Sequence, residues 1–302
     1  MSSNIPFVKE MNFNYGTCAS LTPLIRRVIA ENPGPFTFHG TGTYIVGHGK
    51  VAVIDPGPDL RGHIEVLLKS LKNETITHLI VTHTHRDHSP ATKFIKDATG
   101  AKTYGFGPHG IGTPTMLNDE IEEGADYDFV PDVLIRNGDT INGSGWTLEA
   151  IHTPGHTSNH MCFSLLEEAA LFSGDHVMGW STTVVSPPDG DMAAYLNSLN
   201  IIVDRNEKTI WPTHGPPILN PTLFIHELIK HREEREDQIL TCLKDGTLNI
   251  SSIVSRVYHD IDPVLYPAAG RSVLAHLIHM VDKNQVQCNE HPDINSNFSP
   301  VP

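Results

Sequence analysis

Four apolar runs in this chain, each with the length of a buried strand, end directly in residue types that bind metal ions. Each run is followed by a short loop that holds histidine or aspartate beside glycine, proline or threonine. The runs cover residues 77–81, 146–151, 170–173 and 209–211. Because the ligand types recur at the same place relative to a strand, the pattern predicts a fold whose strand ends converge on one metal centre.

The loop after the first run has the sequence His83-x-His85-x-Asp87-His88. His83 and His85 lie two residues apart and can face one cation, whereas the adjacent Asp87 and His88 can face a second cation in a tight turn. Imidazole nitrogen with carboxylate oxygen favours zinc, with iron or manganese as alternatives. The competing interpretation is a histidine-rich surface loop in a chain with 19 histidines, but it leaves the ligand types after the other runs unexplained.

Three later residues complete two sets of ligands. His156, in a Pro-Gly loop, joins the first set, and His214 joins the second. Asp175 follows Gly174, and its two carboxylate oxygens can bridge both metals, although Gly-Asp also forms ordinary turns. Asp175 and Asp87 are also the predicted catalytic residues. The predicted metal ligands are His83, His85, Asp87, His88, His156, Asp175 and His214.

Other polar residues near these loops have two interpretations each. Asp55 ends the strand of residues 51–54 and either caps a turn or lies beneath the metal loop and binds its backbone. His160 precedes a new strand at residues 161–165, so we expect it to support the site without binding metal. The hydroxyl-rich loop at residues 181–186 either borders a substrate cleft or only turns the chain.

The remaining local patterns predict helices that alternate with the strands. Ser89-Pro90 has the form of a helix start, with serine as the cap and proline in the first turn. The acidic stretch 118–132 has little apolar pattern and predicts a solvated excursion. The glycines of residues 105–110 match a dinucleotide motif in form only, because no helix follows them. The predicted elements are a hairpin at 43–54 and helices at 60–72, 90–98 and 191–204.

Two metals about 3.5–4 Å apart can share a bridging hydroxide at neutral pH and polarise the bond under attack, which is hydrolytic chemistry. Neither a Gly-x-Ser-x-Gly motif nor a Gly-x-x-x-x-Gly-Lys loop offers a competing mechanism. The sequence therefore predicts a dinuclear hydrolase that carries two zinc ions per chain.

The composition restricts the class of protein and the cellular location in which this chemistry is expected. The chain has 302 residues, 39% hydrophobic and 19% charged, as in soluble globular proteins, and its net charge of −14 repels nucleic acid and anionic membranes at long range. It has no apolar run of about 18 residues and no signal-like start, so we expect a cytoplasmic protein with no membrane partner. Its four scattered cysteines favour reduced thiols.

The order and spacing of Asp55, the His83–His88 loop, His156, Asp175 and His214 resemble the metallo-β-lactamase superfamily over roughly residues 20 to 220. This resemblance implies an α/β (α+β) fold, the αββα sandwich, in which two mixed sheets pack face to face and the ligands lie at one edge. Residues 153–157 and 172–175 look most similar to the glyoxalase-II and lactamase-like-protein-2 branches. Pro90 departs from a glycine that is common after the metal motif, but it changes no ligand.

The C-terminal part resembles the small winged-helix-like appendage of the lactamase-like-protein-2 group, which includes endoribonucleases that act on single-stranded RNA. Its 226–288 segment holds seven Lys or Arg against nine Asp or Glu, so it is not a basic nucleic-acid face. We expect this segment to be dispensable for metal binding. The predicted division is a catalytic domain at 1–225, the appendage at 226–288 and a disordered tail at 289–302.

The substrate is the least constrained part of the prediction. The resemblance favours an endoribonuclease on single-stranded RNA, with hydrolysis of a small thioester, ester or lactone in the glyoxalase-II manner as the alternative. A true β-lactamase is less favoured, because no export signal is evident. A non-catalytic metal-bound scaffold and a homo-oligomer remain alternatives.

Overall fold

Two mixed sheets form the centre of the protein in a computed structural model, which describes residues 4–111, 124–246, 249–288 and 291–302. One sheet has the strand order β1-β2-β3-β4-β5-β6-β7 and the other β12-β11-β10-β9-β8. The strands of the first are β1 (Cys18–Ser20), β2 (Ile25–Ile29), β3 (Gly42–Val46), β4 (Lys50–Ile54), β5 (Thr75–Ile80), β6 (Lys102–Gly105) and β7 (Val133–Leu134). Those of the second are β8 (Thr140–Asn142), β9 (Thr147–His152), β10 (Met161–Leu165), β11 (Ala170–Gly174) and β12 (Thr209–Pro212).

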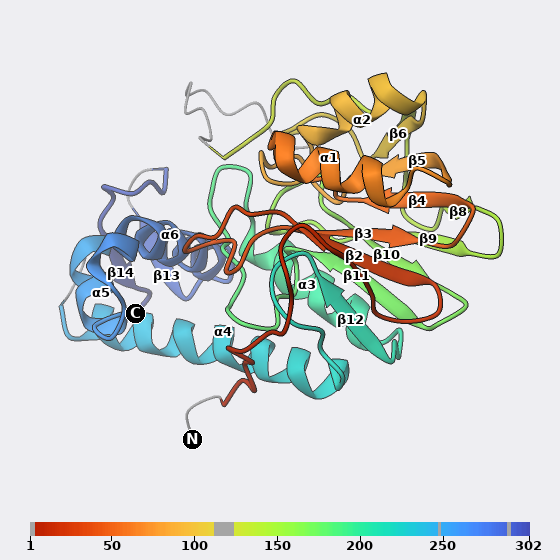
Figure 1. The fold of residues 1–302 in the computed structure, drawn as a ribbon. Coiled ribbons are helices and arrows are strands. Elements are labelled where there is room, and N and C mark those ends of the chain that lie inside the picture. The colour runs from red at the N-terminus through yellow and green to blue at the C-terminus, as the bar shows by residue number, and fades with distance from the viewer. Residues whose placement is uncertain (1–3, 112–123, 247–248, 289–290) are drawn as a thin grey trace.

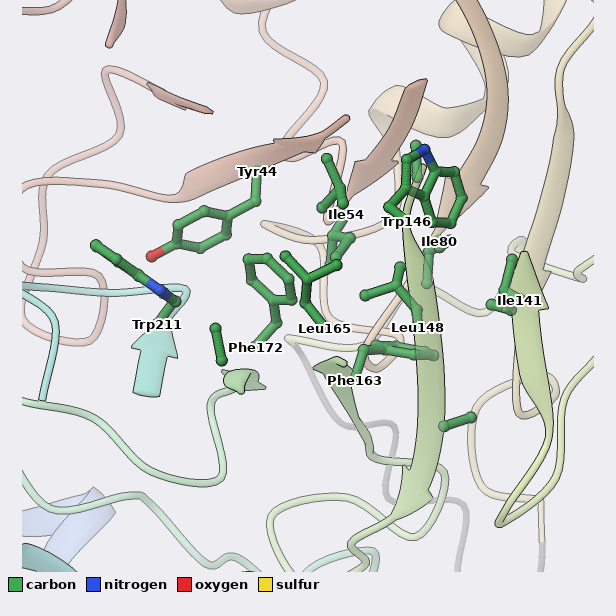
Figure 2. Close-up of a cluster of buried hydrophobic side chains, with 14 of the residues drawn as sticks. Tyr44, Ile54, Ile80, Ile141, Trp146, Leu148, Phe163, Leu165, Phe172 and Trp211 are labelled. Carbon is green, nitrogen blue, oxygen red and sulfur yellow. The ribbon is translucent and has the colours of Figure 1, made fainter. Parts of the chain in front are cut away.

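The inner faces of the two sheets share one apolar core (Figure 2). Tyr44 and Ile80 enter it from the first sheet, and Phe163 and Phe172 from the second, all nearly inaccessible to solvent. Burying an aromatic or branched side chain of this size stabilises the fold by about 1.5–3 kcal/mol each. The alternation of inward and outward residues on the strands therefore holds the two sheets together face to face.

Helices cover the outer faces of both sheets (Figure 1). On the first sheet lie α1 (Arg61–Ser70) and α2 (Ala91–Thr99), whose Leu67 and Ile95 pack on the strands. On the second lie α3 (Met192–Val203) and the first half of α4 (Pro221–Lys244), through Leu199 and Ile225. The order helix, sheet, sheet, helix confirms the predicted αββα sandwich.

The C-terminal part has an apolar core of its own, formed by the second half of α4 and further elements that follow it. Asn249 caps the first of these through a hydrogen bond from the Ser252 amide. The long helix α4 thus crosses the predicted boundary at residue 225 and contributes to both units. The elements are α5 (Ile250–Val257), the short 3-10 helix η1 (Pro263–Leu265), α6 (Tyr266–Asp282), β13 (Val286–Cys288) and β14 (Phe298–Pro300).

Part of the predicted disordered tail is ordered, which corrects the prediction for residues 298–300. This segment is β14, which pairs antiparallel with β13, with Val286 opposite Pro300. Phe298 is 1% exposed and packs in the C-terminal core. One buried aromatic ring and a short strand pairing are enough to hold a segment whose composition alone looks unfavourable for order.

The acidic stretch that was predicted to be a solvated excursion lies partly outside the described residues, at 118–123. Residues 124–126 pack against the His83–His88 loop, so the prediction is wrong there, whereas Tyr127 and Val130 are exposed as predicted. The Asp126 amide donates to the Thr84 carbonyl, and Ala125 forms an isolated bridge with His85. Ser89 donates its hydroxyl to Asp126 and so does not cap α2 with its side chain. No helix in the described ranges has the length and apolar character needed to cross a membrane.

Candidate metal centre

The loops that follow β5, β9, β11 and β12 open at one edge of the sandwich. In the second sheet β9, β11 and β12 run in the same direction, because β9 and β11 are both antiparallel to β10 and β12 is parallel to β11. At this edge three histidine nitrogens approach one another. His85 Nδ1 lies 2.9 Å from His83 Nε2 and 3.1 Å from His156 Nε2. The Val184 carbonyl, which only accepts, lies 2.6 Å from His156 Nδ1, so the proton belongs on Nδ1 and the Nε2 lone pair faces the other two histidines.

A second group of side chains lies beside the first. His214 Nε2 is 3.0 Å from Asp87 Oδ2, and His88 Nε2 is 3.4 Å from the same oxygen. His214 turns its other ring nitrogen toward the Gly40 carbonyl at 3.3 Å. Two imidazole nitrogens and one carboxylate oxygen thus converge, a donor set that suits zinc and other divalent transition metals.

Asp175 lies between the two groups and reaches both. Its Oδ1 is 3.3 Å from His214 Nε2, and its Oδ2 is 3.6 Å from His88 Nε2 and 3.9 Å from His156 Nε2. A side chain at Gly174 would prevent this approach, because a Cβ there would lie 2.6 Å from His160 Nε2. His160 instead accepts a hydrogen bond from the Asp175 amide at 3.2 Å. This is the supporting role expected of His160.

Asp55 lies beneath the metal loop, which decides between its two interpretations. Its carboxylate is fully buried and accepts hydrogen bonds from the Thr82 amide at 2.8 Å and from the Thr82 hydroxyl at 2.9 Å. His88 Nδ1 and the Thr213 hydroxyl lie 2.9 and 2.8 Å from Oδ2. Asp55 therefore ties together two ligand loops and orients the His88 ring, so that Nε2 points to the second group.

Several supporting residues were not singled out from the sequence. Thr82 and Thr213 each directly precede a predicted ligand, and this repeated Thr-His pair is a signal that could have found them. Asn159 donates to the Thr84 hydroxyl at 2.8 Å, and His109 lies 3.0 Å from the same hydroxyl. Asn159 and His109 carry no comparable pattern, because they reach the loop only through tertiary folding.

Charge and hydrogen bonding at this edge favour a cation. Burial opposes charge on His214, but the carboxylates of Asp175 and Asp87 outweigh it and raise the pKa of His214 to about 10. Burial also opposes ionisation of Asp175, but His214 and His88 hold its pKa well below the ordinary value. Within the described residues, the buried atoms His88 Nε2 and Asp175 Oδ1 make no hydrogen bond. Buried ligand atoms that lie near other ligand atoms without forming a hydrogen bond fit the binding of divalent cations.

The structure thus brings all seven predicted ligands to one edge. They form groups of metal-binding geometry in the described chain, made of His83, His85 and His156; of His83, His88 and Asp175; and of Asp87, His88 and His214. The layered fold and this donor set belong to a metal-dependent hydrolase. The binding of metal by these particular residues stays a prediction.

Comparison with known proteins identifies the family. Residues 37–214 match the model of the metallo-β-lactamase superfamily, and residues 250–291 match that of the beta-lactamase associated winged helix domain. The chain therefore belongs to the metallo-β-lactamase superfamily and carries a C-terminal winged helix domain, which confirms the resemblance drawn from the sequence.

Individual relatives agree with this assignment. The chain is 35% identical to the beta-lactamase-like protein 2 homolog of Caenorhabditis elegans, over 80% of this chain and 78% of that protein. It is 32% identical to an atrochrysone carboxyl ACP thioesterase of Passalora fulva, over 79% of this chain and 69% of that protein. A metallo-β-lactamase family protein from Thermus thermophilus has the same fold, with a TM-score of 0.75 at 20% identity, covering 93% of this chain and all (100%) of that one.

Proposed function

We propose that this protein is a dinuclear zinc hydrolase that cleaves a thioester or a related activated ester. The observation that carries the proposal is the position of Asp175, whose carboxylate lies within 3.9 Å of ligand atoms from both groups. A carboxylate so placed can hold two cations at a fixed separation. Bound there, the cations would supply an activated water molecule and polarise the substrate carbonyl. Iron or manganese are the alternative metals.

The protein's own residues would fix the ligands before substrate arrives. Asp55 and the Val184 carbonyl hold the protons on the outer nitrogens of His88 and His156, so the lone pairs of the inner nitrogens point into the site, where they can bind metal. Burial of His83 and His88 excludes water from the inner side of the site. These contacts support a preorganised site, which is the main protein contribution to electrostatic catalysis.

Two observations favour a thioester over RNA. Several relatives at 31–34% identity are named as thioesterases, including that of Passalora fulva. Binding single-stranded RNA calls for a positively charged groove, whereas the net charge of this chain is −14 and the 226–288 segment has more acidic than basic residues. Endoribonuclease activity stays the second candidate, on the family resemblance.

Aromatic side chains beside the second ligand group offer a surface for the acyl part of such a substrate. The rings of Phe38 and Trp180 stack at a centroid distance of 4.8 Å, and His39 contacts Phe38 at 3.9 Å. We call this group of three side chains the aromatic wall. It lies beside His214. Gly40, next to His39, contacts His214, and Trp180 lies against Gly215. Planar or apolar acyl groups suit such a surface.

The test offers three substrates side by side to the zinc-loaded protein: a glutathione or pantetheine thioester, single-stranded RNA and a cephalosporin, each with and without chelator. We expect thioester turnover that chelator abolishes and zinc restores. Chelator-sensitive cleavage of RNA without thioester turnover would establish the second candidate instead. Stoichiometric zinc with no turnover on any of the three would favour the non-catalytic scaffold.

A further inference from the structure

Arg232 is a buried arginine on α4, outside the segment that matches the metallo-β-lactamase domain. Its side chain is 2% exposed, and its guanidinium lies 5.2 Å from the centre of the Tyr195 ring on α3. One guanidinium nitrogen donates to the Thr183 carbonyl at 2.5 Å. The residue therefore reaches from the helix that leads into the winged helix domain to a loop of the catalytic domain.

Arg232 forms no ion pair in the part of the chain that the structure describes, and its Nε has no hydrogen-bond partner there. Glu236, one turn later on α4, is bound instead by His276, His279 and Lys283 at 3.4, 2.7 and 3.5 Å. A buried charge without a carboxylate partner destabilises a fold. Stabilisation by a salt bridge therefore does not explain why this buried arginine is directed at the Thr183 carbonyl.

The loop that Arg232 holds contacts both sides of the metal centre. The Thr183 hydroxyl donates to the Asp175 carbonyl at 2.8 Å, so this residue fixes the backbone that carries the bridging carboxylate. The next carbonyl, that of Val184, lies 2.6 Å from His156 Nδ1 and sets the orientation of that ring. A donor on the Thr183 carbonyl fixes the planar peptide unit as far as the Val184 Cα, so only the φ and ψ torsions of Val184 lie between this fixed unit and the carbonyl that orients His156.

We propose that Arg232 is a positioning residue for the metal centre, and this proposal rests on the proposed metal site. It fixes the 183–184 loop, and through that loop it holds the His156 ring and the Asp175 backbone in the orientation that metal binding needs. Outer contacts of this kind typically change metal affinity about 10–100-fold when removed. The metal site then depends on α4, which runs against the expectation that residues 226–288 are dispensable for metal binding.

The experiment compares Arg232→Met with Arg235→Met in the full-length protein. Arg235 lies three residues later on the same helix and binds the Val257 carbonyl and the Tyr258 ring, away from the loop. Zinc affinity is measured by chelator competition, and the His156 environment by the absorption spectrum of the cobalt-substituted protein. We expect Arg232→Met to lower zinc affinity by about 10–100-fold and to change the cobalt spectrum, while Arg235→Met changes neither.

Arg232→Lys distinguishes position from charge. Lysine keeps the charge and can still donate to the Thr183 carbonyl, so we expect it to restore most of the zinc affinity. It also provides the test if Arg232→Met fails to fold. Equal zinc affinity and unchanged cobalt spectra in the wild type, Arg232→Met and Arg235→Met would overturn the proposal. If Arg232→Met does not fold, a zinc affinity of Arg232→Lys at least about 10-fold below that of the wild type, with unchanged amide exchange in residues 183–186, would overturn it as well, because the loss would then not pass through that loop.

Failure of the proposed function gives a different result. A wild-type protein that binds no zinc would refute the dinuclear site itself. Amide hydrogen exchange in the metal-free protein then still reports on Arg232: we expect faster exchange in residues 183–186 of Arg232→Met than in Arg235→Met. Equal exchange rates in that loop would refute the positioning role.

Discussion

Two clusters of histidine and carboxylate lie in the two halves of this protein, and they have different forms. We call the edge of the sandwich that holds the seven predicted ligands the metal edge. There, ligand atoms of Asp175, His88 and His214 lie near one another, and some of them have no hydrogen-bond partner within the described chain. In the C-terminal core, the Glu236 carboxylate is bound by His276, His279 and Lys283. Only the first cluster forms a group of metal-binding geometry among the described residues.

The comparison teaches that composition does not distinguish a metal site from a buried ion-pair network. Burial opposes ionisation of Glu236, but hydrogen bonds from His276 and His279 lower its pKa to about 2. That carboxylate already has its partners and needs no cation. The carboxylate of Asp175 lies between two groups of ligand atoms, and its Oδ1 makes no hydrogen bond within the described chain, which fits the proposed metal-binding role.

The largest effect is expected from Asp175→Ala. Loss of the shared carboxylate should loosen both cations and lower kcat by about 10³-fold or more, as for other major electrostatic elements of active sites. Bound zinc per chain and kcat are measured together. Asp191→Ala, which removes the side-chain N-cap of α3 and leaves every predicted ligand in place, is the matched control and should only reduce stability. Near-normal activity with two bound metals in Asp175→Ala, but not in His85→Ala, would assign the bridge to another carboxylate.

Asp55→Asn should have the next largest effect. An amide cannot accept from Thr82, Thr213 and His88 in the way the carboxylate does. We expect zinc affinity to fall about 10–100-fold, measured by chelator competition. Asp132→Asn serves as control, since that exposed carboxylate binds Thr103 on the same sheet but contacts no ligand loop. An equal loss in both variants would mean that Asp55 acts only on the stability of the sheet.

Glu236→Gln tests the other cluster through pH. Because the folded state lowers the pKa of Glu236 to about 2, the carboxylate stabilises the fold above the unfolded-state pKa, and this contribution is lost as pH falls toward 2. Below the ordinary glutamate pKa the wild type should lose on the order of 2 kcal/mol that Glu236→Gln never had. Urea unfolding at several pH values measures this. Glu233→Gln, on the exposed side of α4, should retain the wild-type slope, and zinc binding at neutral pH should be unchanged in both.

The smallest effect is expected from Trp180→Ala in the aromatic wall. Loss of the stacked ring should raise KM about 5–20-fold for thioesters with an aromatic acyl group and little for acetyl thioesters, with kcat retained. Phe36→Ala, which removes an exposed phenylalanine near the wall, is the control. A uniform loss of kcat for both acyl groups would show that Trp180 supports the His214 loop and does not contact substrate.

The strand pattern of the sequence predicted that the ligands gather at one edge, and the resemblance to the metallo-β-lactamase superfamily implied the layered fold. The strand pattern was local: an apolar run of strand length followed at once by a ligand type, repeated four times. Strand ends that run in the same direction meet at one edge, so their loops had to approach each other. The predictions of a disordered tail and of a solvated stretch failed at β14 and at residues 124–126, where single contacts such as the burial of Phe298 decide the structure.

Tertiary structure alone decided which residues support the ligands. Asp55 binds Thr213 across 158 positions of sequence, and Arg232 binds Thr183 across 49. Such contacts produce no periodic pattern in the sequence, because each consists of one side chain that binds one distant group. The sequence by itself determined that ligands gather at strand ends, since strand and loop patterns are local. The orientation of those ligands, and the link from α4 to the metal edge, arise only when the sheets and helices pack.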